Sequence, residues 1–200
     1  MDELQIDWNQ EKPEGSQLTE LWKTIKFIPI ETWTNATEVL KEKISESHSN
    51  GGIQLHKYKI IGNPHFDWFA SRNRLDEINF IENVLQNKNL QNYRDNLKIT
   101  KDKPVFKLIK YSTDIYDLPG ELARMLGYGG AYHKVDPKTA WAVATEFVKE
   151  EFQYRFEEFN KFQIAIESAN WFYDIAWDYS AILFDKRNYE LIFLDVTDED

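Results

Sequence analysis

Residues 117–173 constrain the fold of this 200-residue chain more than any other stretch. Asp117, a good helix-capping residue, is followed by an apolar stripe at helical spacing: Leu118, Leu122, Met125 and Leu126. The pair Asp136-Pro137 then predicts a second helix start, because aspartate caps helix N-termini and proline at the first helical position loses no needed N–H partner. A domain built on this stretch is expected to be mostly α-helical.

Apolar residues after Pro137 continue at helical spacing. The first group is Trp141, Ala144, Val148 and Phe152, and the second is Phe159, Phe162, Ile166 and Ala169. A break is expected near Tyr154 or Arg155. The spacing therefore predicts two packed helices with a corner between them, whose aromatic rings fill a core.

A glycine-rich turn separates the two predicted helix starts. Gly127 falls where a helix C-cap requires positive φ, and Gly129 and Gly130 give the next residues backbone freedom. Residues 127–130 could cradle an anion in front of a helix. They lack the spacing of phosphate-binding loops, however, and no lysine follows to reach a phosphate. A packed turn is the favoured interpretation.

Shorter patterns predict the remaining elements. A first helix is expected over residues 17–27 and is ended by Pro29. A second helix is expected to begin after a cap at Thr34 or Asn35, and a third is expected to run from Ser71 or Asn73 to Leu85. Residues 53–61 alternate as a strand, while residues 105–111 fit either a strand or a helix. Residues 181–185 and 189–196 predict a hairpin, with a helix continuing through Asp178 as the alternative for its first part.

The expected organisation is a flexible arm over residues 1–16, attached through Ile6 and Trp8, and a single α-rich domain over residues 17–200. Pro13 and Gly15 break regular structure in the arm. Residues 198–200 are expected to fray. We therefore predict a mostly α domain with a minor β element, a short hairpin near the end of the chain.

Composition narrows the functional classes. The chain has no cysteine, which excludes disulfides and thiolate metal sites. Its beginning has no basic segment followed by an apolar run, and no stretch approaches the ~20 apolar residues that span a bilayer. A cytoplasmic protein without a membrane partner is expected.

The net charge of −10 is concentrated in one quarter of the chain. Residues 146–200 contain 14 Asp and Glu against 5 Lys and Arg, together with 14 of the 30 aromatic residues. An acidic aromatic surface repels nucleic-acid phosphates and favours a basic protein partner. An ordinary solvated acidic face is the alternative.

The predicted partner-binding residues lie in this acidic part of the chain. They are Glu167, Asp174, Trp177, Asp178 and Tyr179. Asp174 and Asp178 would lie one turn apart on a helix, flanked by Trp171 and Trp177, and buried carboxylates beside tryptophan can act as general acids. A hydrolase that uses Glu167, Asp174 and Asp178 is therefore the alternative, and it requires a concave pocket where at least two of them converge.

No catalytic, metal or cofactor residues are predicted. The four histidines, His48, His56, His65 and His133, fall in no metal-binding spacing, and only His65 with Asp67 and His133 with Asp136 form near pairs. No serine lies in a nucleophile-elbow context.

One group of short motifs consists of Asp117, Gly127, Tyr128, Ala131, Tyr132, Ala140, Trp141, Phe156, Glu157, Glu158, Phe159, Trp171 and Phe172. Together these residues resemble the pattern of a bacterial family of unknown function, the YbeU/YbeR-type proteins. The resemblance covers residues 117–173 and implies no established activity. Proteins related to this family are encoded near bacterial toxin-delivery genes, where small acidic proteins often serve as immunity factors. The resemblance therefore implies such a role for this chain.

The sequence therefore favours an immunity-type inhibitor that binds a basic toxin domain directly. The alternatives are the carboxylate hydrolase and a scaffold or regulatory domain without catalysis.

Overall fold

Two neighbouring apolar runs near the end of the chain form the centre of the sheet. The structure is a computed structural model that describes residues 7–200. β5 (Tyr179–Asp185) and β6 (Glu190–Thr197) pair antiparallel as the predicted hairpin, which is confirmed. The Asp185 carboxylate accepts hydrogen bonds from the backbone N–H groups of Arg187 and Asn188, both at 2.9 Å, and so fixes the turn.

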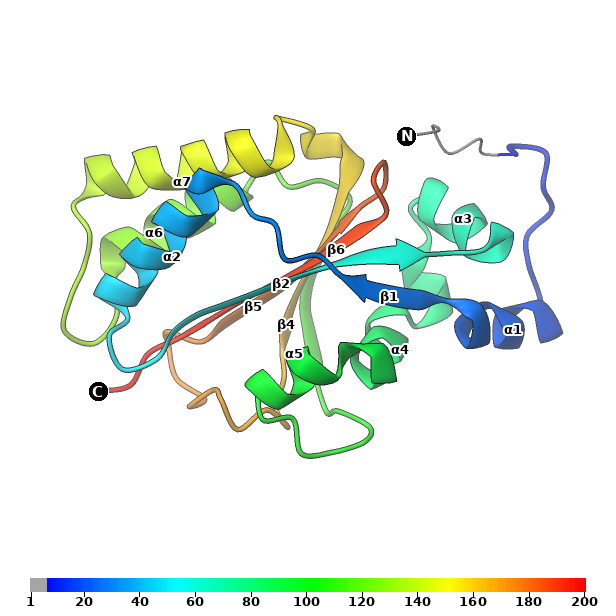
Figure 1. The fold of residues 1–200 in the computed structure, drawn as a ribbon, viewed down its shortest axis with the longest axis horizontal. Helices are drawn as coiled ribbons and strands as arrows, with labels where there is room; N and C mark the ends of the chain where they lie inside the picture. Colours follow the sequence, from blue (N-terminus) through cyan, green and yellow to red (C-terminus); the bar gives the residue numbers. More distant parts are fainter. Residues whose placement is uncertain (1–6) are drawn as a thin grey trace.

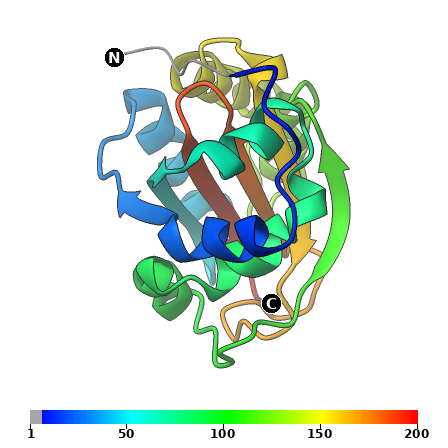
Figure 2. The same ribbon diagram turned by 90° about the vertical axis from the view of Figure 1, so that its right-hand side faces the viewer.

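Four further strands complete a six-stranded antiparallel sheet in the described residues. They are β1 (Lys26–Pro29), β2 (Gly52–Ile61), β3 (Lys107–Ser112) and β4 (Phe159–Ala165), and the spatial order is β1-β2-β6-β5-β4-β3. β2 confirms the strand predicted over residues 53–61, and β3 shows that residues 105–111 contain a strand. Figure 2 shows β3, in green, along one edge of this sheet.

Helices cover both faces of the sheet (Figure 1). One face packs against α1 (Ser16–Thr24), α3 (Pro64–Ser71), α4 (Phe80–Gln86) and α5 (Gln91–Asn96). The other packs against α2 (Asn35–Ser47), α6 (Leu118–Tyr128) and α7 (Pro137–Phe152). Short 3₁₀ turns lie at Leu75–Ile78, Lys88–Leu90 and Phe156–Glu158. Each face of the sheet thus has its own apolar core.

The prediction of a mostly α, or all-α, protein is wrong, and β4 shows why. Residues 159–169 were expected to be a helix, yet residues 159–165 form a strand between β3 and β5. Phe162 and Ile164 point to one core and Phe159 to the other. A strand buried on both faces has apolar residues at mixed intervals, and these imitate helical spacing over a short segment.

Local capping signals were more reliable than spacing. Thr34 accepts a hydrogen bond from the Thr37 N–H, and Asp136 accepts one from the Thr139 N–H, so both predicted caps are confirmed. Asp117 precedes α6 but makes no capping hydrogen bond.

Several predicted boundaries are wrong. The helix predicted to end at Pro29 ends at Thr24, because β1 begins two residues later. α6 continues through Gly127, and the positive-φ cap is Gly129, at 72°. The helix predicted up to Leu85 is broken at Asn79, which adopts a φ of 48°.

Residues 7–15 of the predicted arm contact α3. The Trp68 indole N–H donates to the Gln10 carbonyl at 2.9 Å, and Arg72 donates to the Trp8 carbonyl at 3.0 Å. Ile6 lies outside the described residues. No helix within residues 7–200 has the length and apolar character needed to cross a membrane.

Candidate partner-binding site

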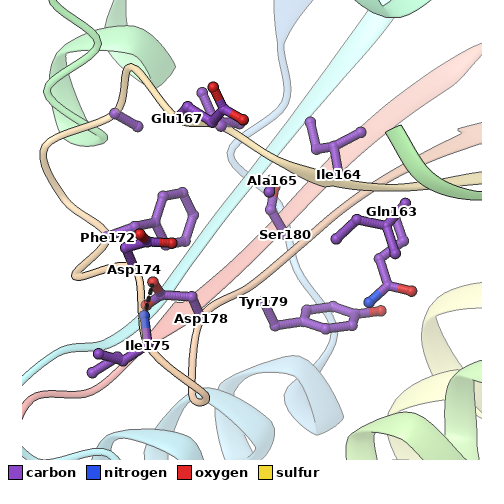
Figure 3. A pocket seen from close by; sticks show the side chains of 13 residues that line it. Gln163, Ile164, Ala165, Glu167, Phe172, Asp174, Ile175, Asp178, Tyr179 and Ser180 are labelled. Atoms are coloured by element: carbon purple, nitrogen blue, oxygen red, sulfur yellow. Dashed lines mark hydrogen bonds between the residues drawn. The ribbon is translucent and has the colours of Figure 1, made fainter. Parts of the chain in front are cut away.

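The connection from β4 to β5, residues 166–178, borders a surface hollow of about 480 Å³ (Figure 3). Much of its lining is apolar and comes from β3, β4 and the connection itself: Ile109, Ile164, Ala165, Ile166, Ala169, Phe172 and Ile175. Such a lining can take apolar atoms of a ligand or partner.

Four of the five predicted partner-binding residues line this hollow: Glu167, Asp174, Asp178 and Tyr179. The fifth, Trp177, lines a second hollow of about 360 Å³ beside α6. The two hollows share Gln163, Asp178 and Tyr179, so residues 174–179 lie between them. The structure thus brings the five predicted residues into one region.

Residues 174–178 are not helical, so a helix turn is not what brings Asp174 and Asp178 together. Asp174 adopts a left-handed φ of 60°, a conformation that aspartate tolerates better than most residues. Asp178 then closes a tight loop: its backbone N–H donates to the Ile175 carbonyl at 3.1 Å, and its Oδ2 accepts from the Ile175 N–H at 3.0 Å (Figure 3).

The three carboxylates of the hollow differ in their partners. Both oxygens of Asp178 are used inside the protein, since Oδ1 accepts a hydrogen bond from the Thr197 hydroxyl. Glu167 and Asp174 are exposed, and neither carboxylate has a hydrogen bond or ion pair within residues 7–200. Asp178 therefore shapes the site, whereas Glu167 and Asp174 can contact a partner.

A buried polar network lies under the second hollow. The Tyr179 hydroxyl donates to Glu121 Oε2 at 2.8 Å, and Glu121 Oε1 accepts from Lys161 Nζ at 2.9 Å. Lys161 is fully buried on β4 and also pairs with Asp117, which in turn pairs with Lys110. The network ties α6 to the sheet beside the candidate site.

The network changes the acidity of its members. Burial, followed by the Glu121 charge, raises the pKa of Tyr179. Burial alone would raise the pKa of Asp117, but hydrogen bonds from Lys110 and Lys161 outweigh it, and the pKa is lowered. Tyr179 therefore stays a neutral donor and Asp117 an anion at neutral pH.

Sequence reasoning missed Glu121, Lys161 and Thr197 as neighbours of the site. They lie far from residues 167–179 in the chain or on another element, and no local motif links them. One signal was present: Lys161 interrupts an apolar run, and a lysine inside a buried strand requires a paired carboxylate.

The glycine turn is packed, as favoured, and the residue that follows it donates its backbone N–H to a carboxyl group of the same chain. The Asp198 carboxylate accepts a hydrogen bond from the Ala131 N–H at 2.7 Å. The prediction that residues 198–200 fray is wrong for Asp198, which is fully buried.

No group of three potential metal ligands occurs within residues 7–200. His48 is buried against Ser47, and burial lowers its pKa. His56 contacts Asn96, and burial lowers its pKa too. Asp136, which forms a near pair with His133 in sequence, caps α7 as predicted.

The fold and the site together define an α/β protein whose single sheet carries an acid-rimmed hollow beside its β4–β5 connection. No protein-family model, no curated protein and no solved structure matches this chain. The resemblance to YbeU/YbeR-type proteins stays a prediction.

Proposed function

We propose that this protein is a cytoplasmic, immunity-type inhibitor that binds a basic toxin domain directly through the 480 Å³ hollow and residues 167–179. The observation that carries the proposal is the pair of exposed carboxylates, Glu167 and Asp174, at a hollow with apolar lining. Lysine and arginine fit such a hollow, since their aliphatic stems bury against apolar surface while their charged ends meet carboxylates.

Aromatic residues beside the hollow support the same proposal. Trp177 and Tyr179 are partly buried at the second hollow, and Tyr128 is 79% exposed at its border. Tryptophan and tyrosine contribute much of the binding energy in protein interfaces because they bury large rigid areas.

The hydrolase alternative receives partial support, because Glu167, Asp174 and Asp178 do line one hollow. A general acid or base must be free to exchange a proton with a substrate, however, and both oxygens of Asp178 are already bonded to Thr197 and Ile175. The remaining two carboxylates are exposed, which favours charge recognition over acid–base catalysis. The alternative of a scaffold domain without a charged partner assigns no function to the exposed carboxylates of Glu167 and Asp174.

Charge reversal at the hollow tests the proposal. The tagged protein, recovered from the cells that naturally produce it, is expected to retain a basic protein that mass spectrometry identifies. The double variant Glu167→Lys and Asp174→Lys should lower the retained amount at least about tenfold, because like charges facing each other across an interface cost more than 1.4 kcal/mol together.

The matched control is Glu20→Lys with Glu150→Lys, which changes the net charge equally at exposed positions on α1 and α7. This control should retain the partner. Equal loss in both double variants would mean that overall charge, rather than the hollow, governs binding, and recovery of no basic protein by the unmodified chain would refute the inhibitor proposal.

A further inference from the structure

Thr197, the last residue of β6, and Asp198, which directly follows it, contact three separate loops. Thr197 is fully buried, and its hydroxyl donates to Asp178 Oδ1 in the loop at the hollow. A hydrogen bond to a charged group is about twice as strong as one between neutral groups. Thr197 therefore restrains a loop that has no helix or strand structure of its own.

The Asp198 carboxylate joins the other two loops. Its Oδ1 accepts from the Asn50 N–H at 2.8 Å, in the turn between α2 and β2. Its Oδ2 accepts from the Ala131 N–H at 2.7 Å, in the turn between α6 and α7. Because the group is fully buried, these two N–H donors provide hydrogen bonds to oxygens that water cannot reach.

Glycines make room for this arrangement. A methyl group on Gly130 would overlap the Asp198 carboxylate, and one on Gly51 would overlap the Thr197 carbonyl. Both neighbouring turns therefore approach residues 197 and 198 more closely than any side chain allows. The position of Thr197 is thus fixed from both sides.

The next residue, Glu199, adds a contact to the turn between α2 and β2. Its carbonyl accepts from the Asn50 side-chain amide at 2.7 Å. Figure 1 shows the end of β6 on the same side of the molecule as the orange 166–178 connection.

We infer that Thr197, itself fixed by Asp198, is a positioning residue that holds residues 174–178 in their binding conformation. The part of this inference that concerns binding rests on the proposed function. Asp178 links the two roles, since it receives the Thr197 hydroxyl on one oxygen and closes the loop at Ile175 with the other. A loop held in its bound shape loses less conformational entropy when a partner binds.

Substitution of Thr197 separates the hydroxyl from the shape of the side chain. Thr197→Val keeps the volume and removes the donor, whereas Thr197→Ser keeps the donor. Hydrogen exchange of the amides in residues 174–178 should become about tenfold faster in Thr197→Val and return towards the unmodified rate in Thr197→Ser. The slowest amides of β5 report global unfolding and measure how much the lost hydrogen bond lowers the overall stability of each protein.

The partner identified by the capture experiment supplies the second readout. Binding should weaken in Thr197→Val and recover in Thr197→Ser, although neither variant changes a charge at the hollow. Unchanged exchange in Thr197→Val overturns the positioning role, whatever the partner does.

Faster exchange with unchanged binding overturns the link between the loop shape and recognition. If charge reversal at Glu167 and Asp174 still abolishes capture in that case, the proposed function stands without the positioning role. If the unmodified protein captures no basic partner, the proposed function fails, and hydrogen exchange alone decides whether Thr197 positions the loop.

Discussion

Asp195 is a fully buried carboxyl group on β6, one of the central strands of the sheet. Its Oδ1 accepts from the Ser180 hydroxyl at 2.5 Å, while its Oδ2 has no hydrogen-bond partner. Burial raises the pKa of Asp195 to about 7, although the hydrogen bond from the Ser180 hydroxyl opposes the shift. Part of the acidic excess of residues 146–200 is therefore internal, as is also true of the buried Asp185 and Asp198.

The raised pKa predicts that Asp195 makes stability depend on pH. Between about pH 4 and pH 7 the folded protein keeps a proton that the unfolded chain has lost, so its free energy of unfolding falls as the pH rises through this window. About three pH units at 1.36 kcal/mol each give a loss of about 4 kcal/mol. Asp195→Asn cannot titrate and should lack this loss.

Urea unfolding at pH 4, 6 and 8 measures the effect as a difference between the two proteins. The asparagine side chain can itself lower the free energy of unfolding by an amount that does not depend on pH. This amount cancels, because the test compares how the difference between the two proteins changes with pH. Glu20→Gln removes an exposed carboxyl and serves as the control. A difference between Asp195→Asn and the unmodified protein that stays constant from pH 4 to pH 8 would contradict the buried titration.

At the scale of elements, the turn between α6 and α7 depends on one glycine for close packing. Gly130 donates its N–H to the Ser47 carbonyl at 3.1 Å and lies against the Asp198 carboxylate. Gly120, in the first turn of α6, has open space around its Cα. Gly120, inside α6, thus has room for a side chain, whereas Gly130, in the turn after α6, has none.

Alanine substitutions should reveal this contrast. Gly130→Ala should destabilise the protein by at least about 1–3 kcal/mol, the usual cost of forcing atoms into a packed site. Gly120→Ala should stabilise it by up to about 1 kcal/mol, because alanine favours the helix over the unfolded chain. Urea unfolding of both variants checks the prediction, and a neutral Gly130→Ala would show that the turn can move away from Asp198.

Elements with local signals could be predicted from the sequence. The caps Thr34 and Asp136 act within three residues, and the β5–β6 hairpin has two apolar runs around a polar turn. β4 could not be recognised, because its burial on both faces depends on α7 and α4 packing from opposite sides. A seven-residue strand that distant elements bury on both faces does not show the alternation of apolar and polar residues by which strands are recognised.

The candidate site shows the same limit. Asp174, Trp177, Asp178 and Tyr179 could be grouped because they are close in sequence. The Thr197 hydroxyl that fixes Asp178 comes from another strand, and its contact depends on sheet register. The pairing of Tyr179 with Val196 belongs to that register, and it cannot be derived until the arrangement of the sheet is known.

At the scale of the whole molecule, one sheet separates two apolar cores that are nonetheless joined through the same strands. Ile182 and Leu183 are neighbours on β5, fully buried on opposite faces. Ile182 packs with the core under α1, α3, α4 and α5, and Leu183 with the core under α2, α6 and α7. Loss of either core removes the support of the central hairpin, so the two faces should unfold together.

This coupling predicts that damage on one face loosens the other. Ile182→Ala and Leu183→Ala should each lower the free energy of unfolding by about 2–5 kcal/mol. Hydrogen exchange of amides in α7 should accelerate in Ile182→Ala as much as that of amides in α3, because both open only through global unfolding. The control is Ile28→Ala on the edge strand β1, where Ile28 is 49% exposed and the cost should stay within about 0.5 kcal/mol. Faster exchange in α3 with unchanged exchange in α7 would show instead that the sheet holds two independent folding units. In that case the face covered by α2, α6 and α7 would keep its structure when the opposite core is lost, and with it the Asp198 contact and the Tyr179 network.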